Sequence, residues 1–148
     1  MDYKNNLGYL LHHLGFVMDR QSDQLLQERL DMGFSQFKIL MALKWSAGIQ
    51  QKQIAERLGQ TEASVSRQVK LLKDVGYVSV TKSKTNRREH IITLTTKGVT
   101  AVDKAMRALN NYHAPIFERF SPADQEKLKQ LLQALHNEMC ARDPSGHS

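Results

Sequence analysis

Small, hydroxyl-bearing and basic side chains share one face of a predicted helix at residues 61–74. At roughly 100° per residue, Ala63, Arg67 and Lys70 lie opposite an apolar stripe of valine and leucine. Small residues let a helix approach a DNA major groove, where an arginine can hydrogen-bond guanine and a hydroxyl can bind a base or a phosphate. A surface helix with ordinary solubilising charges is the alternative. The candidate major-groove residues are Thr61, Ala63, Ser64, Ser66, Arg67 and Lys70.

A second basic cluster lies between two segments that have the pattern of strands. Residues 77–82 alternate apolar and polar side chains, and residues 90–95 are rich in β-branched ones, so we expect a β-hairpin. Basic side chains at its tip can follow phosphates or place an arginine in a narrow minor groove. A flexible charged turn would have the same composition. The basic residues are Lys82, Lys84, Arg87 and Arg88.

Two short helices joined by a glycine turn are predicted just before this hairpin. Residues 51–58 form the first, Gly59 ends it because glycine adopts a left-handed backbone at low cost, and Thr61 caps the second. This is the helix-turn-helix pattern. An earlier helix, capped by Ser35 and running through Trp45, has apolar residues on more than one face and is expected to form the central core. A helix-turn-helix followed by a basic hairpin describes a winged helix.

The charge distribution points to a polyanionic partner for this region. The 148-residue chain carries a net charge of +6, and residues 50–90 alone hold nine basic and four acidic side chains. Such a basic block favours nucleic acid over a merely solvated surface. No apolar run approaches the roughly 20 residues of a membrane span, no secretory signal is visible, and a single cysteine forms no internal disulfide. A soluble, cytoplasmic protein is expected.

The motifs of this region resemble those of the MarR family of bacterial transcription regulators. Residues 54–69 read IAERLGQTEASVSRQV and residues 72–78 read LKDVGYV. Residues 86–88 read Asn-Arg-Arg and are followed at 92–98 by ITLTTKG, where the family has a Leu-Thr-x-x-Gly run that opens the next helix. The resemblance extends over nearly the whole chain, including the long outer helices.

This resemblance implies a mainly α-helical fold with a small β-hairpin wing, assembled as a homodimer. A single domain, residues 1–148, is expected, with dimerisation helices at 1–30 and 99–142 and a winged helix-turn-helix lobe at 35–97. Residues 142–148 are expected to form a frayed tail. The apolar stripes of the terminal segments are more than one small lobe can cover, although packing on each other within a monomer is the alternative. The predicted interface residues are Leu7, Leu10, Leu11, Leu14, Leu128, Leu131, Leu132, Leu135 and Met139.

The same likeness assigns roles to the candidate DNA contacts. It implies that Arg67 faces the major groove together with Ser64 and Ser66, and that one of the two wing arginines enters the minor groove. Asn86 joins the candidate wing residues, but it stands where the family usually has an aspartate that pairs with a wing arginine. A neutral amide would hold that arginine less firmly, so the identity of the inserted arginine stays open.

Other kinds of site have less support in the sequence. We find no nucleophile–base pair, glycine-rich phosphate loop or paired carboxylates, so no enzyme is predicted. No cofactor or metal site is predicted either, because His12 and His13 point roughly 100° apart on a helix and Cys140 is the single cysteine. Many relatives bind a small aromatic or anionic effector between the dimerisation helices and the DNA-binding lobe. Here that region could include His12, Phe16, Met41 and Trp45.

The predicted function is sequence-specific binding of a pseudo-palindromic, double-stranded DNA operator by a homodimeric repressor whose binding is relieved by a small ligand. The alternatives are a winged-helix module for protein interaction and a metal- or redox-sensing regulator of the same fold.

Overall fold

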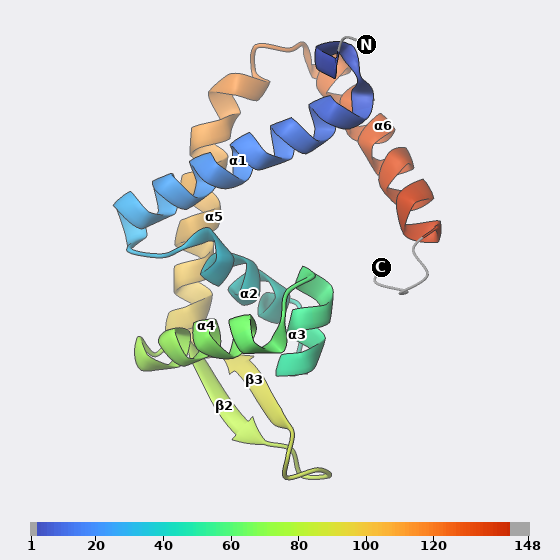
Figure 1. Ribbon diagram of the computed structural model, residues 1–148. Coiled ribbons are helices and arrows are strands. Elements are labelled where there is room, and N and C mark those ends of the chain that lie inside the picture. The colour runs from blue at the N-terminus through green and yellow to red at the C-terminus, as the bar shows by residue number, and fades with distance from the viewer. Residues whose placement is uncertain (1–2, 143–148) are drawn as a thin grey trace. The chain divides into compact units, whose positions relative to one another are not determined.

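The computed structural model describes residues 3–142, which divide into two compact units at the Leu109–Asn110 junction. The expected frayed tail from residue 143 onward lies outside the described residues. The predicted mainly helical, winged helix-turn-helix fold with long terminal helices is confirmed (Figure 1). After a short 3-10 helix, Tyr3–Asn5, the elements are α1 (Leu7–Leu30), α2 (Phe34–Lys44), β1 (Ile49–Gln50), α3 (Gln51–Leu58), α4 (Glu62–Asp74), β2 (Val78–Lys82), β3 (His90–Leu94), α5 (Thr96–Phe117) and α6 (Pro122–Ala141).

The core of the first unit is built around α2, as the sequence predicts. This helix contacts α1, α3, α4 and β3. It buries side chains on more than one face, and the removal of this apolar surface from water is the main force that holds the unit together. The buried residues of α2 are Phe37, Ile39, Leu40 and Leu43, and those of α4 are Val65, Val69 and Leu72.

The start of α2 differs from the prediction, in which Ser35 caps the helix. The helix begins at Phe34, and Gly33 is its N-cap. The Asp23 carboxylate, which belongs to α1, accepts a 2.9 Å hydrogen bond from the Phe34 backbone N–H, and Gln36 Oε1 accepts one of 3.0 Å from the Gly33 N–H. Because these side chains satisfy donors that a helix start leaves open, the helix needs no cap from Ser35.

The sheet has three antiparallel strands, one more than predicted. β3 lies in the middle, with β1 and β2 on either side. In the register, Ile92 of β3 is opposite Val80 of β2 and opposite Ile49 of β1. β1 has only two residues, which is too short for an alternating pattern to appear in the sequence. The other two strands are each one residue shorter than predicted, without Tyr77 and Thr95.

The end of α4 and the start of α5 form one hydrogen-bonded joint. Thr95 Oγ1 accepts a 3.0 Å hydrogen bond from the Gly98 N–H and donates one of 2.6 Å to the Gly76 carbonyl. A Cβ atom at Gly98 would lie 2.0 Å from the Tyr77 carbonyl oxygen, so only glycine allows this approach. The end of α4 is therefore fixed to the start of α5, the helix that follows the hairpin.

An ion pair joins α2 to α5 on the surface of the same unit. Lys44 Nζ lies 2.5 Å from an Asp103 carboxylate oxygen. The hydrogen bond from Lys44 lowers the pKa of Asp103 below its ordinary value, and the charges of Lys44 and Arg107 act in the same direction.

The second unit contains the end of α5 and all of α6. Ser121 caps α6 as predicted, since its Oγ accepts a 3.1 Å hydrogen bond from the Asp124 N–H, and Pro122 occupies the first turn. Within Pro122–Ala141 no side chain is buried. Across residues 3–142, no helix is both long enough and apolar enough to cross a membrane.

Candidate nucleic-acid interface

The predicted recognition helix, α4, presents its polar face to solvent. Thr61 Oγ1 accepts a 3.1 Å hydrogen bond from the Ser64 N–H, which confirms Thr61 as the cap. Ser64 is half-buried beside this cap. The opposite side of the helix packs into the core through Val65, Val69 and Leu72. The polar side chains that remain exposed are therefore the ones that an external partner could contact. The exposed candidates are Thr61, Ala63, Ser66, Arg67 and Lys70.

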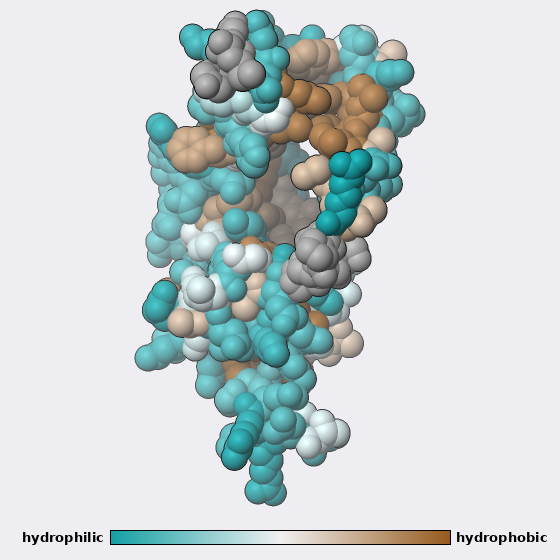
Figure 2. Space-filling view, turned by 45° about the vertical axis from the view of Figure 1, so that its right-hand side comes forward, coloured by the Kyte–Doolittle hydropathy of each residue, from teal (hydrophilic) through white to brown (hydrophobic). Residues whose placement is uncertain are grey.

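β2 and β3 form the predicted hairpin, which projects from the helices of the first unit (Figure 1). Ser79 and Thr93 are opposite each other and share a 2.7 Å hydrogen bond between their hydroxyls. The surface at the hairpin end is almost entirely hydrophilic (Figure 2). All five candidate residues of the wing are exposed: Lys82, Lys84, Asn86, Arg87 and Arg88.

The tip of the wing is held by local side-chain hydrogen bonds. Ser83 Oγ accepts hydrogen bonds from the backbone N–H groups of Thr85 and Asn86, each at 3.3 Å. Asn86 Oδ1 accepts a 3.1 Å hydrogen bond from the Arg88 N–H. These bonds are the turn-forming contacts for which serine and asparagine are favoured. Asn86 therefore orders the backbone that carries the arginines, and its oxygen is bonded to a main-chain group rather than to a guanidinium.

The base of the wing is tied to the start of the helix-turn-helix. Gln50, the residue before α3, donates a 2.6 Å hydrogen bond from Nε2 to Glu89 Oε2. Its backbone N–H donates a 3.0 Å hydrogen bond to Gln53 Oε1 within the first turn of α3. The Ser83 N–H donates a 2.8 Å hydrogen bond to the Glu89 carbonyl, which closes the loop between β2 and β3 at its base. Sequence reasoning missed Gln50 and Glu89, because their relationship depends on the two-residue strand β1.

The basic groups of this surface have no acidic partners. Within residues 3–142, the ion pairs join Lys38 to Asp19, Lys44 to Asp103 and Lys129 to Glu126, and none involves α4 or the wing. An unpaired, exposed cation has its charge available for an external anion. The cations in question are Arg67, Lys70, Lys82, Lys84, Arg87 and Arg88.

The residues predicted for a dimer interface are mostly exposed in the single chain. On α1, Leu7, Leu10 and Leu14 are exposed and Leu11 is half-buried. On α6, four of the five are exposed and Leu135 is half-buried: Leu128, Leu131, Leu132 and Met139.

The four residues predicted to line an effector pocket differ in how far they are buried. His12 and Phe16 are exposed on α1, and Met41 is half-buried on α2. Trp45 is 78% exposed, with Lys44 Nζ 5.6 Å from its ring centroid.

Cys140 Sγ lies 3.5 Å from His136 Nε2 on α6. Among the described residues, no group of three or more His, Cys, Asp or Glu side chains could hold a metal ion.

Comparisons with known proteins agree on one family. The sequence model of the MarR family matches residues 30–89, from the end of α1 to the base of the wing. An uncharacterised HTH-type transcriptional regulator of Bacillus cereus is 25% identical over 136 residues, which cover 89% of this chain and 90% of that protein.

Solved structures show the same fold. Apo MarR from E. coli matches with a TM-score of 0.81 and 22% identity over 88% of this chain and 96% of that one. A mutant of that MarR in complex with operator DNA matches with a TM-score of 0.72 and 22% identity, over 87% and 92% of the two chains. CouR from Rhodococcus jostii RHA1, bound to p-coumaroyl-CoA, matches with a TM-score of 0.76 and 20% identity, over 91% and 94%. Residues 30–89 therefore match the MarR family, and the chain as a whole is similar to HTH-type transcription regulators and shares the fold of MarR.

Proposed function

We propose that this chain binds double-stranded operator DNA through α4 and the wing and represses transcription as a homodimer in the bacterial cytoplasm. The observation that carries the proposal is the basic surface without acidic partners. Arg67 on α4 and Arg87 and Arg88 on the wing are exposed, and within residues 3–142 they form no ion pair. Neutralisation of phosphates by such cations supplies most of the sequence-independent affinity for DNA.

In this proposal the major groove receives α4 and the minor groove receives the wing. Ala63 lets the helix backbone approach the bases, Arg67 and Ser66 reach base edges, and Lys70 contacts a phosphate. A wing arginine enters a narrow minor groove, where the negative potential is enhanced. The complex of a MarR mutant with operator DNA supports this proposal, since the two chains share a fold.

A homodimer would present two recognition helices to the two halves of a pseudo-palindrome, roughly 34–36 Å apart. The exposed apolar side chains of α1 and α6 support this assembly, because large apolar patches mark interaction surfaces. Leu131 is 57% exposed and Met139 is 65% exposed. We expect Leu131→Glu to shift the protein to a monomer in sedimentation equilibrium. Gln133→Glu adds the same charge at an exposed polar position of α6 and should leave the dimer intact.

We further propose that a small aromatic or anionic effector relieves DNA binding, with His12, Phe16, Met41 and Trp45 as its expected lining. CouR provides the supporting comparison, since it was solved with p-coumaroyl-CoA. Trp45 is the only tryptophan of the chain, so its fluorescence reports directly on this region. An effector that relieves DNA binding without changing Trp45 emission would place the effector elsewhere.

The decisive experiment selects bound duplexes from a random pool and then measures their affinity by fluorescence anisotropy. We expect the selection to recover a pseudo-palindrome, and the variant Arg67→Ala/Lys70→Ala to lose it. The control variant Lys127→Ala removes an exposed charge from α6, outside the proposed surface. A folded dimer that retains no duplex at low salt would overturn the proposal in favour of a protein-interaction module.

A further inference from the structure

Glu62 is an exposed carboxylate at the first position of α4, among the cations of the basic surface. Within residues 3–142, its side chain forms no ion pair and no hydrogen bond. The carboxylate at the base of the wing differs, since Glu89 accepts a hydrogen bond from Gln50. Because an ionised carboxylate only accepts hydrogen bonds, Glu62 presents two free acceptor oxygens at the start of the helix.

The start of α4 lies where the helix-turn-helix meets the wing. Glu62 lines a recess of about 160 Å³, which it shares with Lys52 in the first turn of α3 and with Arg88 of the wing. The two cations offset part of the repulsion between this carboxylate and the phosphates of a bound duplex. The recess therefore allows an acidic side chain to approach DNA at this point.

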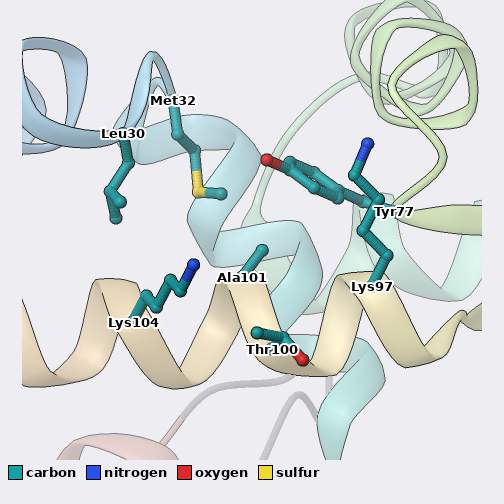
Figure 3. A pocket seen from close by; sticks show the side chains of 7 residues that line it. All are labelled: Leu30, Met32, Tyr77, Lys97, Thr100, Ala101 and Lys104. Carbon is teal, nitrogen blue, oxygen red and sulfur yellow. The ribbon is translucent and has the colours of Figure 1, made fainter.

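The two ends of α4 are held differently. At the C-terminal end, Lys97 Nζ donates a 2.6 Å hydrogen bond to the Val75 carbonyl and lies 5.4 Å from the centroid of the Tyr77 ring (Figure 3). At the N-terminal end, Thr61 caps the helix and Glu62 is left to solvent. In a helix-turn-helix, the N-terminal residues of the second helix contact base edges in the major groove. Glu62 therefore occupies a position from which a base can be read.

A carboxylate in the major groove favours one base over the other three. Phosphates repel it, so it lowers affinity unless a base edge supplies a hydrogen-bond donor. Guanine and thymine present acceptors in this groove, and adenine presents its N6 amino group beside the N7 acceptor, which repels a carboxylate. Cytosine presents its N4 amino group, a donor that aspartate and glutamate accept from. An unpartnered glutamate at this position therefore selects cytosine.

We propose that Glu62 is a specificity-determining residue that accepts a hydrogen bond from the N4 amino group of a cytosine in each half of the operator. The inference rests on the proposed function and adds an acidic base contact to it. Ser66 is one turn along the same side of α4, because residues four apart are neighbours on a helix. The cytosine therefore lies next to the pairs that Ser66 and Arg67 read. A first-turn glutamate also stabilises a helix through the helix dipole, but that effect does not depend on the DNA sequence.

Selection from a random pool tests the base preference. We expect the wild-type half-site to contain a cytosine that Glu62→Ala no longer selects. Glu62→Gln should replace it with adenine, because a glutamine amide binds N6 and N7 of adenine together. Asp74→Asn is the matched control, since it removes the same charge from an exposed position at the other end of α4. If Glu62→Gln strengthens binding to every duplex equally and leaves the selected sequence unchanged, the carboxylate only repels phosphates and the inference is overturned.

A modified operator tests the same contact without a change in the protein. N4-methylcytosine at the selected position still pairs with guanine, but a methyl group replaces the amino hydrogen that faces the major groove. We expect this base to weaken wild-type binding roughly tenfold, within the range of one good base contact, and to leave the affinity of Glu62→Ala unchanged. Fluorescence anisotropy at one salt concentration provides the comparison. An equal loss in both proteins overturns the inference, while the proposed function stands. A folded wild-type dimer that recovers no duplex overturns the proposed function and this inference with it.

Discussion

Gln50 Nε2 donates a 2.6 Å hydrogen bond to Glu89 Oε2, which links the residue before α3 to the base of the wing. The same residue pairs with Ile91 where β1 runs beside β3. The wing therefore has two attachments to the helix-turn-helix, one through the backbone and one through side chains. Because DNA would contact both elements at once, this link bears on affinity even though neither side chain needs to touch DNA.

A double-mutant cycle tests whether this bond positions the wing. We expect Gln50→Ala and Glu89→Ala to be coupled in operator binding by about 0.5–3 kcal/mol, the range for residues that share an interaction. The cycle is needed because Glu89→Ala also removes a negative charge near the proposed DNA surface, which by itself strengthens binding. Anisotropy titrations of the four proteins provide the coupling energy, and strictly additive effects would contradict a positioning role.

Arg67→Ala should separate base recognition from phosphate neutralisation. If Arg67 contacts a guanine edge, its loss costs about 1–3 kcal/mol and relaxes the preference at one base pair. Lys70→Ala should instead weaken binding to all duplexes by a similar factor, because a phosphate contact carries no sequence information. Selection from a random pool with each variant provides the comparison. A selected sequence that is unchanged by Arg67→Ala would remove Arg67 from the base contacts.

The wing arginines should contribute mainly to salt-dependent affinity. We expect Arg87→Ala/Arg88→Ala to weaken operator binding with little change in major-groove preference. Each lost phosphate contact should reduce the slope of log K against log salt by about 0.9. The single variants identify which arginine carries the larger share. If the slope of the double variant equals that of the wild type, the wing does not contact the DNA backbone.

The sequence predicts the elements well where a local pattern encodes them. The apolar stripe of α4, the cap at Thr61 and the cap at Ser121 are all confirmed, because each depends on residues a few positions apart. The missed features depend on tertiary contacts, as in the Asp23 bond that moves the start of α2 and in the pairing of β1 with β3.

In the candidate site too, the sequence predicts the features that a local pattern encodes and misses those that depend on tertiary contacts. The charge pattern identifies the exposed cations of α4 and the wing, since exposure of a charged face is a local property of an amphipathic helix or hairpin. The Gln50–Glu89 bond joins residues 39 positions apart, and no pattern in a single sequence marks such a pair. For Asn86, the sequence did not show what its side chain binds. The structure shows that its Oδ1 accepts a hydrogen bond from the Arg88 N–H.

Lys44→Met should raise the pKa of Asp103. The hydrogen bond from Lys44 holds this pKa below the ordinary value of 3.8, so the pair stabilises the fold above that value and the contribution is lost as pH falls through the lower, folded-state pKa. The ¹³C shift of the Asp103 carboxyl, followed from pH 6 downward, provides the measurement. Lys38→Met is the control, because Lys38 pairs with Asp19 and not with Asp103. An equal Asp103 midpoint in wild type and Lys44→Met would contradict the assignment.

Gly98→Ala should destabilise the protein strongly, while Gly15→Ala should stabilise it. A methyl group at Gly98 would lie 2.0 Å from the Tyr77 carbonyl oxygen, whereas one at Gly15 meets no atom within 4 Å. Overpacking costs about 1–3 kcal/mol, and more when the clash is with backbone. Alanine in place of glycine inside an exposed helix such as α1 gains roughly 0.5–1 kcal/mol. Urea unfolding at one protomer concentration compares the two variants, because dimerisation would make stability depend on concentration.

Since the Gly98 contact joins the end of α4 to α5, Gly98→Ala should also weaken operator binding at temperatures where the protein is still folded. Unchanged stability in Gly98→Ala would show that this joint can open without cost.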